Sequence, residues 1–257
     1  MASRVASSTS RAVLTLALGL PLLALALAPA VLAVGSPQGD SAAAWPGTWN
    51  AYRFTDGSAV IDAENEAGIS PPSVDISSNG ETNASVFLAS DGTNVFFRMR
   101  LLGTPVDAAK GGFDSTFWLV QIATASDDTV RAVVGLNGKP VSTDYVYVTN
   151  AAGTATTVIY ETPFDASGGQ DSRGARGLSD GSGQYFADFQ IPLARITSAS
   201  GGAITGSTPV KVFFGSSRAA NLATINKDYM TGSGVSFAGL ESVALNTGAP
   251  TPTPTPT

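Results

Sequence analysis

The stretch TNVFFRMRLL, residues 93–102, decides the fold class of this chain. Every second side chain in it is apolar, which is the period of a β-strand with one face in a core. The apolar positions are Val95, Phe97, Met99 and Leu101. A second apolar run at 85–90 precedes this stretch, and Asp91-Gly92 separates the two. Because Asp-Gly between two apolar runs is a strong turn signal, these residues predict a β-hairpin.

Runs of the same β type continue along the chain, separated by turns rich in Gly, Asn and Asp. They lie at 117–122, 131–136, 145–149, 157–161, 184–191 and 210–215. Helical patterns are confined to 192–196 and 218–225. Short strands with such turns predict an all-β fold, an antiparallel β-sandwich of the jelly-roll type. We expect it to form one domain over residues 45–245.

Residues 1–33 are typical of a signal peptide. Arg4 and Arg11 supply positive charge, an apolar stretch follows, and cleavage after Ala30 or Ala33 fits the small residues there. An uncleaved membrane anchor is the alternative, since a span needs about 20 apolar residues. We expect cleavage, and therefore a chain that is secreted to the extracellular space or the cell surface. Its short mature N-terminal segment would be 34–44, and it would make no contact with the membrane.

The end of the sequence is typical of a spacer. Residues 246–257 are rich in Pro and Thr and finish with APTPTPTPT. Such a linker favours the extended polyproline II conformation and cannot pack a core. It either projects the domain from a surface or leads to a further module beyond it, and we expect the further module.

The composition excludes several kinds of chemistry. The 257 residues contain no His and no Cys. Disulfides, thiolate nucleophiles and Ser-His pairs are therefore excluded, and neither zinc nor haem is expected. With 14 Lys and Arg against 20 Asp and Glu, the formal net charge is −6. Because phosphate contacts need clustered basic residues, we expect no nucleic-acid partner.

Acidic residues gather near the start of the expected domain. Residues 56–66 hold four carboxylates, and we predict Asp56, Asp62 and Glu64 as ligands of a calcium ion. Calcium takes roughly six to eight oxygen ligands, many of them from carboxylates. The spacing is not that of an EF-hand loop. The alternative is that these acids are solvated loop residues that serve turns and solubility.

Four side chains make up the candidate ligand-binding set. Trp118 lies in a β-type run, and an aromatic face of this kind can stack on a sugar ring. Arg98, Arg100 and Gln190 project from two other runs and would add polar contacts. The alternatives are that Trp118 packs in the core and that the polar residues form the solvated side of a sheet.

Three segments resemble secreted bacterial β-sandwich modules related to the family 9 carbohydrate-binding and DOMON-like domains. They are ASDGTNVFFRMR at 89–100, YFADFQIPL at 185–193 and VKVFFGSSR at 210–218, within a likeness that covers residues 58–245. The resemblance implies a non-catalytic module that binds sugars through paired Trp residues with calcium nearby, or haem in some DOMON relatives. The ligand role implied here rests on Trp118 alone, and the lack of His and Cys argues against haem.

We therefore expect a secreted, non-catalytic binding module that recognises carbohydrate or another extracellular ligand. Its partner would be a polysaccharide or another component of a cell surface. Two alternatives stay open. One is a structural or adhesive cell-surface module without a small ligand. The other is a hydrolase that uses a pair of carboxyl groups about 5–9.5 Å apart.

Overall fold

The computed structural model describes residues 43–63, 66, 68–79, 83–140, 143–162, 174–232, 234–247 and 249–250. The expected signal peptide at 1–33, the start of the mature segment at 34–42, Glu64 and most of the linker at 251–257 lie outside these residues. The described residues all belong to one unit of the chain, Val34–Thr257. Among them, no helix has the length and apolar character needed to cross a membrane.

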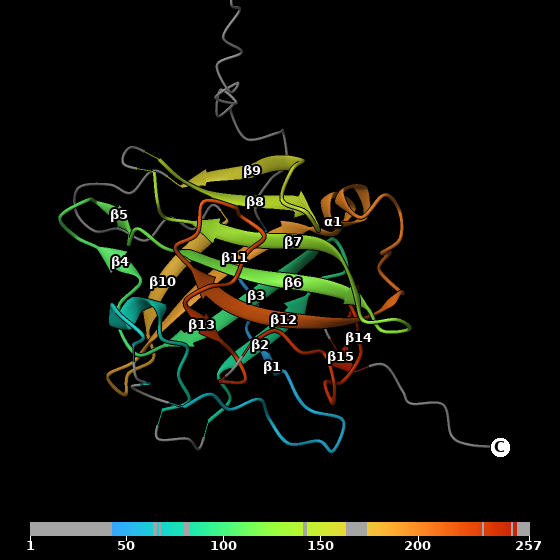
Figure 1. Cartoon of the computed structure of the whole chain (residues 1–257), viewed down its shortest axis with the longest axis horizontal. Helices are drawn as coiled ribbons and strands as arrows, with labels where there is room; N and C mark the ends of the chain where they lie inside the picture. Colours follow the sequence, from blue (N-terminus) through green and yellow to red (C-terminus); the bar gives the residue numbers. More distant parts are fainter. Residues whose placement is uncertain are drawn as a thin grey trace, which may run out of the picture. The chain divides into compact units, whose positions relative to one another are not determined.

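The stretch TNVFFRMRLL forms β3 (Asn94–Leu101), the central strand of a five-stranded antiparallel sheet (Figure 1). The strand order is β1-β2-β3-β11-β10. The other four strands are β1 (Asn50–Ala51), β2 (Val86–Ser90), β11 (Tyr185–Pro192) and β10 (Ala175–Ser179). The predicted hairpin joins β2 to β3. Its turn is held by the Asp91 carboxylate, which accepts hydrogen bonds from the main-chain nitrogens of Thr93 and Asn94 at 2.8 and 2.6 Å.

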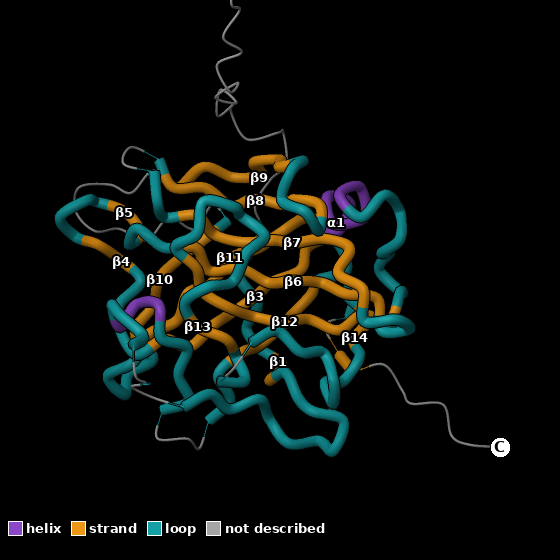
Figure 2. Tube along the Cα trace, in the orientation of Figure 1, coloured by secondary structure: helices purple, strands orange, loops and turns teal. Residues whose placement is uncertain are grey.

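A second antiparallel sheet has eight strands in the order β15-β14-β12-β6-β7-β8-β9, with β13 paired to β12. Their bounds are β6 (Phe117–Thr124), β7 (Thr129–Asn137), β8 (Asp144–Asn150), β9 (Thr156–Thr162), β12 (Pro209–Ser217), β13 (Asp228–Tyr229), β14 (Val243–Ala244) and β15 (Ala249–Pro250). A small separate hairpin pairs β4 (Val106–Asp107) with β5 (Gly112–Phe113). Strands therefore make up most of the regular structure (Figure 2).

Helical structure is short, as the sequence predicts. The 3-10 helix η1 (Pro72–Val74) precedes β2, and α1 (Leu193–Ala199) follows β11, close to the predicted position 192–196. The prediction of a second helix at 218–225 is wrong, because this segment forms bends and turns. Its main chain is bonded to asparagine side chains instead: Asn221 Oδ1 accepts from the Ala223 nitrogen at 2.8 Å. Such local side-chain bonds compete with a helix.

The core lies between the two sheets. Phe97 of β3 stacks on Phe189 of β11, with ring centroids 5.3 Å apart, and meets Phe214 of β12 edge-on at 6.2 Å. All three rings are fully buried, so this contact joins the layers. Figure 1 shows the sheets as two layers, with the eight-stranded sheet in front of the five-stranded one. The predicted all-β, antiparallel sandwich is confirmed.

Candidate metal centre and predicted ligand residues

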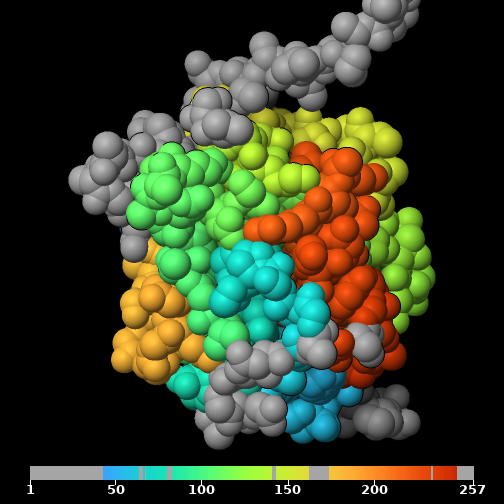
Figure 3. Space-filling view, turned by 60° about the vertical axis from the view of Figure 1, so that its left-hand side comes forward, coloured from blue at the N-terminus to red at the C-terminus, as the bar shows by residue number. Residues whose placement is uncertain are grey.

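Three carboxylates from two distant parts of the chain meet beside the sandwich core. Asp62, Glu66 and Asp228 each place one oxygen so that the three oxygens lie within 4.8 Å of one another. Asp228 is the first residue of β13. In Figure 3 the cyan segment that precedes β2 and the orange-red segment that includes β13 lie side by side. No other group of three or more metal-ligating side chains forms among the described residues.

The main chain fixes Asp62 next to the start of β2. The Val60 nitrogen donates to the Tyr52 carbonyl at 3.0 Å, and the Ser85 nitrogen donates to the Val60 carbonyl at 3.0 Å. The Asp62 nitrogen then donates to Ser85 Oγ at 2.8 Å. Since Ser85 directly precedes β2, Asp62 is anchored to the five-stranded sheet.

Asp228 is held from the other side. Its carboxylate accepts hydrogen bonds from the main-chain nitrogens of Ile76 at 2.5 Å and Tyr229 at 2.7 Å. The strand β13 pairs with β12, so Asp228 belongs to the eight-stranded sheet. Asp75, next to Ile76 and 1% exposed, brings a fourth negative charge close to Asp62 and Asp228.

The Asp62 carboxyl is enclosed but not hydrogen-bonded. The residue is 1% exposed, and neither carboxyl oxygen has a hydrogen-bond partner. Glu66 Oε2 is likewise buried without a partner. Buried polar groups are normally paired, so an enclosed carboxyl with two free oxygens requires an explanation.

Burial and neighbouring negative charges raise the pKa values of the acids in this cluster. Burial raises the pKa of the Asp62 carboxyl to about 9, and nearby negative charges act in the same direction. Those charges belong to Asp228, Glu66 and Asp75. Burial also raises the pKa of Asp228 to about 7 and raises that of Glu66. The charged neighbours that act on Asp62 are therefore all acids, which disfavours the ionised state unless a cation is present.

The structure separates the three predicted calcium ligands. Asp62 is in the cluster, and Glu64 lies outside the described residues. Asp56 is exposed, and its Oδ1 accepts hydrogen bonds from the nitrogen and hydroxyl of Ser58 at 2.8 and 2.6 Å. These bonds lower the pKa of Asp56 and mark it as a turn residue. Asp228 was missed, because nothing near it in sequence shows that β13 meets the segment around Asp62.

Trp118 lies in the core. It is fully buried, its indole nitrogen donates to the Ser73 carbonyl at 2.9 Å, and its ring centroid lies 5.9 Å from that of Phe113. A ring enclosed in this way offers no face for stacking on a sugar. Trp118 therefore packs in the core, which is the alternative that the sequence left open.

Arg98 is bound within the five-stranded sheet. It lies opposite Asp188 across β3 and β11 and donates to both carboxylate oxygens at 2.7 and 2.8 Å. Arg176 of β10 donates to the same carboxylate at 2.8 Å. The guanidinium of Arg98 also lies over the rings of Trp49 and Phe186, at 4.1 and 4.2 Å.

Arg100 and Gln190 also have partners within the chain. Arg100 pairs with Asp180, and Gln190 is fully buried. The Gln190 amide accepts from the main-chain nitrogen of Ala43 at 2.8 Å and donates to the carbonyl of Ala43 at 3.0 Å. The outer face of the sheet is thus neither solvated nor open at these positions. Residues 43–49, which we call the N-terminal strap, cover it at Arg98 and Gln190, and Arg100 lies against Asp180 and the ring of Phe186.

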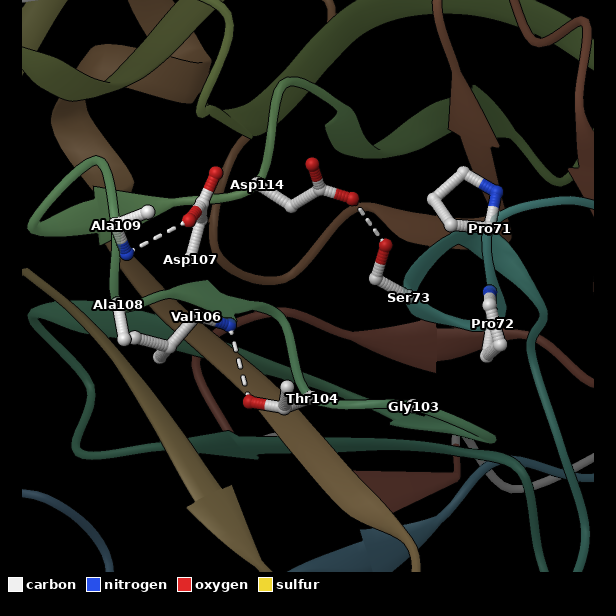
Figure 4. Close-up of a pocket in the computed structure, with 10 residues that line it drawn as sticks. All are labelled: Pro71, Pro72, Ser73, Gly103, Thr104, Val106, Asp107, Ala108, Ala109 and Asp114. Carbon is white, nitrogen blue, oxygen red and sulfur yellow. Dashed lines mark hydrogen bonds between the residues drawn. The ribbon is translucent and has the colours of Figure 1, made fainter.

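A pocket opens elsewhere, between η1 and the β4–β5 hairpin (Figure 4). It has a volume of about 480 Å³ and is lined by Pro71, Pro72, Ser73, Gly103, Thr104, Val106, Asp107, Ala108, Ala109 and Asp114. Hydrogen bonds fix its polar side chains. Ser73 Oγ bonds to Asp114, and Asp107 Oδ1 accepts from the Ala109 nitrogen at 2.9 Å. The pocket did not stand out in the sequence because its walls come from separate segments, residues 71–73, 103–109 and 114.

Glycine is required on one wall of the pocket. A Cβ atom at Gly103 would lie 2.6 Å from Pro72 Cβ and 2.9 Å from the Pro72 carbonyl carbon. The Gly103 nitrogen donates to the Pro72 carbonyl at 2.9 Å, which fixes this close approach. The pocket wall is therefore set by main-chain packing.

Comparison with protein-family models, curated proteins and solved structures finds no match to this chain.

Proposed function

We propose that this chain is a secreted, non-catalytic binding module that recognises carbohydrate through the pocket between η1 and the β4–β5 hairpin. The observation that carries the proposal is the make-up of this pocket. Proline rings, Val106 and two alanines offer apolar surface, and two carboxylates and two hydroxyls lie among them. Small-ligand sites combine apolar walls with a few placed polar groups, and a sugar ring has both kinds of surface.

The acids of the pocket favour binding over hydrolysis. Asp107 accepts hydrogen bonds from the Ala109 and Lys110 nitrogens, and Asp114 accepts from the Ser115 nitrogen and from Arg218. A glycosidase needs one carboxyl group that donates a proton to the leaving group. Carboxylates that already accept bonds from their own loops suit the role of fixed acceptors for sugar hydroxyls. The closely spaced acids of the candidate metal centre are not among the pocket residues.

Retention on polysaccharide tests the proposal. Ala108 is exposed on the pocket wall, so Ala108→Trp fills the pocket with little effect on the core. We expect the wild-type protein to bind at least one polysaccharide and Ala108→Trp to bind it at least about tenfold more weakly. Ala194→Trp, at an exposed position of α1, is the matched control and keeps full binding.

Three results would contradict the proposal. The first is no retention of the wild-type protein on any polysaccharide, which would favour a structural or adhesive module. The second is equal binding by Ala108→Trp and the wild type, which would place the ligand elsewhere. The third is release of new reducing ends from a bound polysaccharide, which would make the protein a hydrolase.

A further inference from the structure

We propose that Asp62, Glu66 and Asp228 bind one calcium ion, which ties the two layers of the sandwich together. Two independent observations carry this. Oxygens of the three carboxylates lie within 4.8 Å of one another. In addition, the Asp62 carboxyl is 1% exposed and has no hydrogen-bond partner on either oxygen, although it belongs to this group. The site is separate from the pocket, so a failure of carbohydrate binding does not bear on it.

Protonation alone does not satisfy the Asp62 carboxyl. A neutral carboxyl group still has one O–H donor and one carbonyl acceptor, and both are costly to bury without partners. Neither Asp62 oxygen has a hydrogen-bond partner, so a neutral Asp62 would still bury its carbonyl oxygen without a donor. A cation bound between the carboxylates would coordinate the free oxygens and cancel their mutual repulsion.

The ligand chemistry selects calcium among the common cations. All three ligands are carboxylates, and the chain has no His or Cys for a softer metal. Magnesium demands near-octahedral geometry at about 2.0–2.1 Å and keeps several of its water molecules. Calcium accepts irregular geometry at about 2.3–2.6 Å and readily takes several carboxylates. An enclosed group of acids drawn from separate loops therefore suits calcium.

The ion would act as a cross-link between the layers. Asp62 is bonded to Ser85 beside β2, in the five-stranded sheet, whereas Asp228 opens β13, which pairs with β12 in the other sheet. These residues come together only in the folded chain. An ion that binds the folded state alone raises its stability in proportion to the logarithm of the ion concentration.

The experiment uses the full-length exported protein, freed of metal by chelation and dialysis. We expect calorimetric titration to show one calcium ion bound per chain. A calcium concentration about a hundred times Kd should raise Tm by roughly 5–10 °C, from the size of the linkage effect and the usual shift for a domain of this length. Magnesium at the same concentration should raise Tm less.

Three variants locate the site. Asp62→Asn removes the enclosed carboxylate, and Glu66→Gln removes a half-buried one whose loss the fold tolerates more easily. We expect each to weaken calcium binding at least about tenfold, and the calcium-induced rise in Tm should disappear in Asp62→Asn. Asp56→Asn is the matched control, because Asp56 lies in the same segment but is exposed and bonded to Ser58. It should bind calcium as the wild type does.

Several outcomes would overturn the proposal. The metal-free wild-type protein could show neither heat of binding nor a shift in Tm with calcium. Asp62→Asn and Glu66→Gln could both keep wild-type affinity. Asp56→Asn could lose binding instead, which would place the site in the exposed turn. A response to magnesium equal to that with calcium would overturn the identity of the ion.

Discussion

Two buried carboxyl groups, those of Asp188 and Asp62, have charged neighbours of opposite sign. Asp188 is fully buried and accepts three hydrogen bonds from Arg98 and Arg176, at 2.7 to 2.8 Å. Asp62 is buried to the same degree, but the charged neighbours that act on it are acids. A buried charge is tolerated only when it is paired. The chain supplies the counter-charge of Asp188 itself, whereas the charged neighbours of Asp62 favour its uncharged form unless a cation binds.

The register of the five-stranded sheet explains the first case. Asp188 of β11 lies directly opposite Arg98 of β3 on one side and Arg176 of β10 on the other. Trp49 and Trp45 of the N-terminal strap lie over these two guanidinium groups, at 4.1 and 4.3 Å. The rings shield the ion pairs from water, which strengthens the attraction between the charges.

The largest expected effect comes from breaking the paired site. Asp188→Asn removes the charge and leaves two largely buried arginines without their carboxylate. We expect the free energy of unfolding to fall by about 3–5 kcal/mol, the usual loss when one partner of a buried ion pair is removed. Urea denaturation measures it.

The control for this change is Asp127→Asn. Asp127 pairs with Arg131 at 2.6 Å, but both side chains are more than a third exposed. Surface pairs contribute little to stability, so this variant should unfold close to the wild type. Equal stability of the Asp188→Asn and Asp127→Asn variants would contradict our account of the buried pair.

The same substitution at the unpaired site should have the opposite outcome. In the presence of chelator, Asp62→Asn replaces a carboxyl that has no cation beside it with a neutral group of nearly the same shape. We expect the free energy of unfolding at neutral pH to change by less than about 0.5 kcal/mol, because the raised pKa of Asp62 already leaves its carboxyl uncharged when no cation is bound. Urea denaturation in chelator measures this. A loss comparable with that of Asp188→Asn would mean that Asp62 has a partner within the chain.

The sequence predicts the strands of the two sheets better than it predicts the residues of the candidate sites. Alternation over 93–102 and the turn at Asp91-Gly92 correctly place β3 and its hairpin, because both signals are local. The density of acids at 56–66 points to Asp62, which lies in the group of three carboxylates. It does not exclude Asp56, although the Asp-Gly-Ser pattern, in which Ser58 bonds back to the carboxylate, is a turn signal that could have done so.

The remaining site residues depend on contacts that no local pattern contains. Asp228 reaches Asp62 only because β13 pairs with β12. Arg98 meets Asp188 because of the register between β3 and β11, and alternation alone cannot tell such a paired arginine from a solvated one. Gln190 is buried because the main chain at Ala43 folds back onto it. These outcomes follow from tertiary packing, which a single sequence read by period does not specify.

A smaller effect than that of Asp188→Asn is expected from the aromatic ring that covers the paired site. Trp49→Ala removes the aromatic face 4.1 Å from the Arg98 guanidinium but leaves the bonds between Arg98 and Asp188 in place. We expect a loss of about 1 kcal/mol in the free energy of unfolding, the upper part of the range for a cation–π contact near the surface. Thr48→Ala, at the exposed neighbouring position, is the control and should change stability less. If both variants have the same free energy of unfolding, Trp49 does not stabilise the site of Arg98 and Asp188. The difference between Asp188 and Asp62 then depends on the ion pairs alone.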